Sequence, residues 1–168
     1  MIPIIIVISS IFLDGILTNY LPYSPSTLSL FTPLLTVVSF ILIYPFYRKK
    51  IKNYYLISII IGLIYDLLYT NLLFINAILF LIIAYITKII YKNIEVNYLN
   101  IILFVKTIIS LYEALNGLII VVFNLVPITI EGIVYKITHS LLLNILTTEI
   151  IYIFIKYLPK KYKKININ

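Results

Sequence analysis

Ionisable side chains occur inside long apolar runs of this sequence. Asp66 lies in IIGLIYDLLYTNLLFINAILFL, residues 60–81, and Asp14 and Glu113 lie in two other apolar runs. An isolated charge at the centre of a bilayer costs at least about 2.5–3.5 kcal/mol, so such residues normally face the interior of a helix bundle and pair there. The buried carboxylates could therefore serve catalysis, form a binding pocket, or hold helices together by hydrogen bonds.

The motifs of the common catalytic and metal sites are missing. The chain has one histidine, His139, no cysteine and no H-E-x-x-H pair, which argues against a zinc site. No nucleophile elbow accompanies the hydroxyl residues, and four glycines are too few for a Walker or other glycine-rich nucleotide loop. We therefore expect a protein that is not an enzyme and that holds no metal or cofactor.

Composition predicts the elements that must position these side chains. The chain has 168 residues, of which 62% are hydrophobic and 11% charged, whereas soluble domains are about 45–50% apolar and about 25% charged. A membrane span needs about 20 mostly apolar helical residues. The sequence predicts an all-α bundle of six transmembrane helices in one integral membrane domain, residues 1–168, with spans near 2–20, 28–47, 54–70, 73–91, 98–123 and 132–157.

Basic residues predict the orientation of these spans. RKKIK, residues 48–52, follows the second span, Lys88 and Lys92 close the fourth, and Lys156 with KKYKK, residues 160–164, follows the sixth. The alternate connections contain no lysine or arginine. By the positive-inside rule, both termini face the cytoplasm and the protein is a multi-pass protein of the cell membrane. The net charge of +7 marks this orientation rather than nucleic-acid binding, and the basic tail could also contact anionic lipid.

The first outer connection is expected to be irregular or re-entrant. It contains Pro22 and Pro25, and Pro33 stands at the start of the second predicted span. Proline has no backbone N–H and restricts the residue before it, so it interrupts regular helix.

Polar residues gather at one depth of the predicted bundle. A rise of 1.5 Å per residue places Asp14 and Asp66 about 18 Å from the cytoplasmic starts of their spans, in the outer half. Helical spacing puts Gly62 and Tyr69 on the face of Asp66, and Lys136, Ser140 and Asn144 at intervals of four. The polar face either joins helices or forms an outward-facing pocket or docking surface. The candidate residues are Asp14, Gly62, Tyr65, Asp66, Tyr69, Asn76, Glu113, Asn116, Lys136 and His139.

Several stretches resemble a known family. The first span contains Asp14-Gly15, the second reads FTPLLTVVSFILIYPFY over residues 31–47, and GLIYDLLYTNLLFINAILFLIIAYI follows over residues 62–86. With the size and the six predicted spans, they resemble MreD, the small integral membrane component of the bacterial rod-shape machinery. The main shared motif is G-x-x-Y-D, residues 62–66. The chain from about residue 97 carries less of the resemblance, which therefore assigns no role to Glu113 or His139.

The resemblance implies a non-enzymatic scaffold of the cell-elongation machinery. Such a scaffold binds MreC directly and, through it, connects MreB filaments with RodA and a class B penicillin-binding protein that build peptidoglycan. The family is also similar in fold to the substrate-binding S components of energy-coupling-factor vitamin transporters. An S component with a vitamin pocket is therefore the alternative, although Ser9 and Ser10 stand where those proteins use small residues such as alanines to dock their transporter. A lipid-processing enzyme or flippase has no motif here.

Overall fold

A computed structural model describes residues 2–20, 32–70, 72–93, 97–123 and 129–156. The regular structure of these residues is entirely α-helical, which confirms the all-α part of the predicted fold. The helices are α1 (Ile2–Tyr20), α2 (Leu35–Leu42), α3 (Tyr44–Tyr47), α4 (Ile51–Tyr69), α5 (Ile75–Asn93), α6 (Tyr98–Val122) and α7 (Ile130–Lys156).

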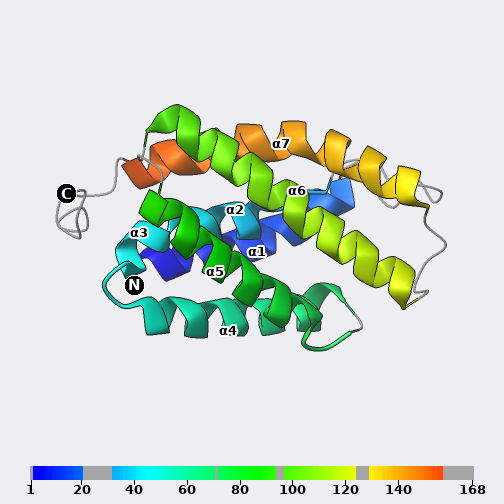
Figure 1. The fold of residues 1–168 in the computed structure, drawn as a ribbon, viewed down its shortest axis with the longest axis horizontal. Coiled ribbons are helices and arrows are strands. Elements are labelled where there is room, and N and C mark those ends of the chain that lie inside the picture. The colour runs from blue at the N-terminus through cyan, green and yellow to red at the C-terminus, as the bar shows by residue number, and fades with distance from the viewer. Residues whose placement is uncertain (1, 21–31, 71, 94–96, 124–128, 157–168) are drawn as a thin grey trace.

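Five helices are long and apolar enough to cross a membrane: α1, α4, α5, α6 and α7. They lie roughly side by side, with α1, α4 and α6 starting at one end of the bundle and α5 and α7 returning to it (Figure 1). Helix α4 packs along α5, and α6 packs along α7. Large apolar side chains cover the outside of these helices, as expected for a surface that faces lipid.

The second predicted span differs from the observed structure. Within the described part of 28–47, residues 32–34 are not helical, α2 begins at Leu35, and the helix is interrupted at Ile43 before α3. Pro33 and Pro45 explain both irregularities, because proline contributes no N–H to a helix and constrains the residue before it. The first part of this predicted span, residues 28–31, lies outside the described residues.

Helix α2 is the centre of the bundle. All eight of its residues are buried, and it contacts α1, α5, α6 and α7 (Figure 1). Its sequence LTVVSFIL is apolar nearly all round, which is the pattern of a helix enclosed by others. A short enclosed helix leaves its first N–H groups inside the protein, where water cannot satisfy them.

Aromatic rings fill the bundle between α2, α4 and α5. Phe40 stacks on Tyr54 with ring centroids 4.5 Å apart and meets Phe80 edge-on at 5.6 Å. The Tyr54 hydroxyl donates to the Phe40 carbonyl oxygen at 3.0 Å, so the buried phenol is satisfied. This rigid cluster fixes α2 against α4.

Candidate functional site

Asp14 of α1 caps the enclosed start of α2. One carboxylate oxygen accepts the Leu35 N–H at 2.8 Å, and the other accepts the Thr36 N–H at 3.0 Å and the Thr36 hydroxyl at 2.6 Å. Helix α2 has no capping side chain of its own at Leu34. A carboxylate at a helix N-terminus satisfies unpaired donors and complements the helix dipole. Asp14, which is 2% exposed, therefore caps α2 from the neighbouring helix α1.

Asn144 of α7 holds the segment that leads into α2. Its side-chain oxygen accepts the Leu34 N–H at 2.8 Å, and its amide nitrogen donates to the Thr32 carbonyl oxygen at 2.9 Å. Both groups of one amide thus bind the backbone of the non-helical residues before α2. The spacing of Asn144 from Lys136 predicts its place on an inward face, and its burial agrees with that.

Asp66 of α4 caps the start of α5, as Asp14 caps the start of α2. Its oxygens lie 3.0 and 3.1 Å from the Asn76 backbone nitrogen, and one of them accepts the Ala77 N–H at 3.3 Å. The Asn76 side-chain amide donates to the same carboxylate at 2.9 Å, and the Asn76 oxygen accepts the Tyr112 hydroxyl at 2.6 Å. A chain of hydrogen bonds therefore connects α4, α5 and α6.

Gly62 lies one helical turn before Asp66 and faces the same start of α5. A Cβ atom placed on Gly62 would lie 2.6 Å from the Ala77 nitrogen and 2.6 Å from the Asn76 carbonyl oxygen. Such distances are too short for any side chain, and backbone cannot move as a flexible side chain does. Glycine therefore permits the close helix approach that brings the α5 N–H groups within reach of Asp66.

Glu113 of α6 forms a buried ion pair with Lys136 of α7. The Lys136 Nζ lies 2.9 Å from Glu113 Oε2, and the two side chains are 14% and 1% exposed. Neither Glu113 oxygen has a well-aligned hydrogen bond to any described residue, so charge rather than a directed bond holds this pair. The other oxygen, Oε1, has no hydrogen-bond partner within the described part of the chain.

A cavity of about 220 Å³ lies among these groups. It is bounded by α1, the segment before α2, α4, the start of α5, and α6. Its lining residues are Asp14, Thr18, Thr32, Pro33, Leu34, Tyr65, Tyr69, Thr70, Asn76, Tyr112, Glu113 and Asn116. The structure thus brings Asp14, Tyr65, Tyr69, Asn76, Glu113 and Asn116 of the predicted set around one space.

The other predicted residues have different places. Gly62, Asp66 and Lys136 lie behind the lining and act through α5 or Glu113. His139 does not contribute to the described lining; its ring packs on Tyr135 at 3.7 Å between centroids, with Nδ1 2.9 Å from the Tyr135 carbonyl oxygen. Within the described residues, no three His, Cys, Asp or Glu side chains are grouped to hold a metal ion.

Thr36 and Tyr112 are two hydrogen-bonding residues that the sequence reasoning missed. Thr36 completes the cap with Asp14, and Tyr112 binds Asn76 and borders the cavity. A threonine three residues after Pro33 is consistent with the first turn of a helix, which is the signal that could have located Thr36. Tyr112 stands beside Glu113 in the sequence, but nothing in the apolar run distinguishes it from the other tyrosines.

Comparison with known proteins assigns the family. A family model described as rod shape-determining protein MreD matches residues 1–162. The chain belongs to the MreD family. No curated protein and no solved structure gives a significant match. MreD membership and the five long apolar helices together make this a multi-pass protein of the cell membrane with a role in rod-shape determination.

The stretches that resemble MreD coincide with the capped helix starts. Asp14 caps α2, and Gly15 beside it leaves room for Tyr69, whose hydroxyl would lie 2.6 Å from a Cβ atom on Gly15. That hydroxyl donates to the Ile11 carbonyl oxygen at 2.5 Å and so joins α4 to α1. In this MreD chain, each of the two motifs, Asp-Gly and G-x-x-Y-D, therefore combines a glycine that allows close packing with an aspartate that caps a helix.

Proposed function

We propose that this chain is a non-enzymatic scaffold of the elongation machinery that binds MreC directly. Through MreC it couples MreB inside the cell to RodA and a class B penicillin-binding protein, and so helps control peptidoglycan synthesis. The observation that supports this most is how the buried carboxylates are used. Asp14 and Asp66 direct their oxygens to the N–H groups of α2 and α5, which builds a rigid bundle and leaves neither as a free acid or base.

The path of the chain supports a sixth crossing of the membrane. Helices α1 and α4 both start at the same end of the bundle, so the chain must return between them, and α2 and α3 lie on that return (Figure 1). The 13 residues of 35–47 make a helical path of only about 20 Å, so non-helical chain before Leu35 must complete a crossing of about 30 Å. We assign residues 32–34 to that crossing.

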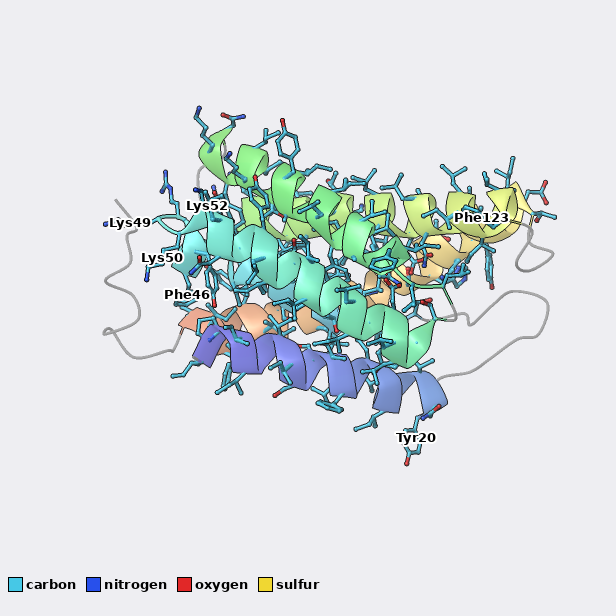
Figure 2. All side chains as sticks on the ribbon, turned by 90° about the horizontal axis from the view of Figure 1, so that it is seen from below. Tyr20, Phe46, Lys49, Lys50, Lys52 and Phe123 are labelled. Atoms are coloured by element: carbon cyan, nitrogen blue, oxygen red, sulfur yellow. The ribbon has the colours of Figure 1, made fainter. Side chains whose placement is uncertain are left out.

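The charge at the two ends supports cytoplasmic termini. Lys49, Lys50 and Lys52 gather at the end where α3 meets α4, whereas Tyr20 and Phe123 lie at the opposite end (Figure 2). Helices α5 and α7 finish at the basic end and carry Lys92 and Lys156 in their last turns. Positive charge favours the cytoplasmic side, so the polar cavity lies in the outer half of the bilayer.

Co-purification tests the scaffold. The tagged full chain, extracted in mild detergent from a bacterial membrane that contains MreC, should retain MreC. An unrelated single-span membrane protein with the same tag gives the background. Recovery of MreC no greater than this background, from a chain that elutes as a single monodisperse species, would contradict the proposal.

A solute-binding S component is the second candidate, and the cavity of about 220 Å³ is the observation that favours it. Against it, Ser10 is buried in the bundle and its hydroxyl donates to the Ile6 carbonyl oxygen at 2.9 Å, which leaves Ser9 as the exposed small residue of the pair. Thermal-shift screening of the purified chain against vitamins separates the two candidates. A specific stabilising vitamin would promote this candidate.

A further inference from the structure

One residue of the cavity lining, Glu113, has a carboxylate oxygen that no hydrogen-bond donor of the described residues pairs with. Asp14 is also in the lining, but its oxygens already accept bonds from Leu35 and Thr36. Glu113 is 1% exposed and lines the cavity, and its Oε1 has no hydrogen-bond partner within the described residues. A buried acceptor left unpaired costs about 1–3 kcal/mol, more when it is charged, so an occupant that donates a hydrogen bond would be favoured there.

Charge decides which kind of donor fits. Asp14 and Glu113 both border the space, and the nearest cation, Lys136, lies behind Glu113 on its other oxygen and does not line the cavity. The dipoles of α2 and α5 are already complemented by Asp14 and Asp66. An anion would approach the carboxylate oxygens of Asp14 and Glu113, whereas a cation would find an acceptor in Glu113 Oε1.

Aromatic rings complete the environment. Tyr65, Tyr69 and Tyr112 all line the cavity, and the rings of Tyr65 and Tyr69 lie 4.8 Å apart between centroids. The face of a tyrosine ring attracts an ammonium group within about 6 Å. Rings also supply apolar surface for the body of a ligand.

The volume indicates how much of a ligand the cavity can hold. The cavity measures about 220 Å³, while a cavity of about 150 Å³ is enough to bind benzene and pockets for drug-sized ligands measure about 300–1,000 Å³. The space therefore suits a molecule slightly larger than a single six-membered ring.

We infer that the cavity between α1, α4 and α6 is a binding site for a small organic ammonium compound. Its ammonium group donates to Glu113 Oε1, and its apolar body packs against Tyr65, Tyr69 and Tyr112. This site goes beyond the scaffold function and does not depend on MreC. Lys136 remains paired with Oε2, so Glu113 bridges the two cations.

Benzylamine and benzyl alcohol test this assignment on the full chain in nanodiscs of zwitterionic lipid. They have nearly the same size, but only the amine is protonated at neutral pH. Calorimetric titration, with empty nanodiscs subtracted, should show saturable binding of benzylamine about tenfold tighter than that of benzyl alcohol, as expected for a charged hydrogen bond to a buried carboxylate. Equal binding of the two, or no saturable binding of benzylamine, overturns the inference.

Variants locate the site. Glu113→Gln should remove the preference for benzylamine, and Glu131→Gln is the matched control, because Glu131 lies exposed in the first turn of α7 and makes the same change of charge outside the cavity. Asn116→Asp keeps the Glu113–Lys136 pair, adds a carboxylate to the lining, and should tighten benzylamine binding several-fold. Undiminished preference in a folded Glu113→Gln chain, or no gain in a folded Asn116→Asp chain, contradicts the assignment.

Discussion

The Asp66 carboxylate binds both the backbone N–H and the side-chain amide of Asn76, ten residues later in the chain. A side chain near the end of α4 is thereby hydrogen-bonded to the first turn of α5. Asp14 and Thr36 repeat the arrangement between α1 and α2. In a bilayer no water reaches such N–H groups, so a capping carboxylate allows a helix to begin inside the membrane protein.

Two replacements of Asp66 measure how much its hydrogen bonds contribute to the stability of the fold. Asp66→Leu leaves the Asn76 and Ala77 N–H groups without an acceptor and should lower the free energy of unfolding by about 3 kcal/mol or more. Asp66→Asn keeps one acceptor oxygen and should cost about half of that. Unfolding of the purified chain in mixed micelles, followed by circular dichroism, measures both values.

The amount of each Asp66 variant in the membrane gives the matching test in cells. We expect Asp66→Asn to accumulate closer to wild type than Asp66→Leu does. Wild-type stability and accumulation of both variants would show that the cap contributes nothing to the fold.

Thr36→Val tests the cap on α2 with almost no change of side-chain volume. The Thr36 hydroxyl donates to Asp14 at 2.6 Å, and loss of a hydrogen bond to a charged group costs about 1.5–3 kcal/mol. Thr107→Val is the control, since the exposed Thr107 hydroxyl donates to the Leu103 carbonyl oxygen of its own helix. The midpoint of thermal unfolding should fall for Thr36→Val and stay near wild type for Thr107→Val; equal shifts would count against the cap.

Much of this architecture follows from sequence pattern, and the exceptions have a physical cause. Apolar runs of about 20 residues predict α1, α4, α5, α6 and α7 because each helix satisfies its own backbone in lipid. The second predicted span fails as one helix because Pro33 and Pro45 interrupt an apolar run that hydropathy alone treats as uniform.

Depth along the helices predicts the polar cluster but not the partners within it. Asp14 and Asp66 share a depth, yet each binds a different helix start, Leu35 and Asn76. Which helix packs on which is a property of the tertiary fold. For the same reason, spacing along the last helix places His139 near the cluster, whereas its ring packs on Tyr135 of its own helix.

Gly62→Ala should weaken the contact of α4 with α5. The new methyl group would lie 2.6 Å from the Ala77 nitrogen, and overpacking of this kind typically costs about 1–3 kcal/mol. Gly117→Ala is the comparison, because the atoms nearest to its methyl group, at 2.9 and 3.0 Å, belong to the Ile133 side chain and not to backbone. Unfolding midpoints should therefore fall further for Gly62→Ala; a larger loss for Gly117→Ala would contradict the close helix approach.

Glu113 and Lys136 should behave as one unit in a double-mutant cycle. Lys136→Met leaves a buried carboxylate without its cation, and breaking such a pair from one side costs about 3–5 kcal/mol. Glu113→Gln leaves Lys136 without its partner instead. This lysine is 14% exposed and can extend toward water, so this variant should lose less free energy of unfolding. The double variant Glu113→Gln with Lys136→Met removes both charges and should be more stable than Lys136→Met alone, as measured by unfolding in mixed micelles. Additive losses in the double variant would mean that the two side chains do not interact, because independent sites add.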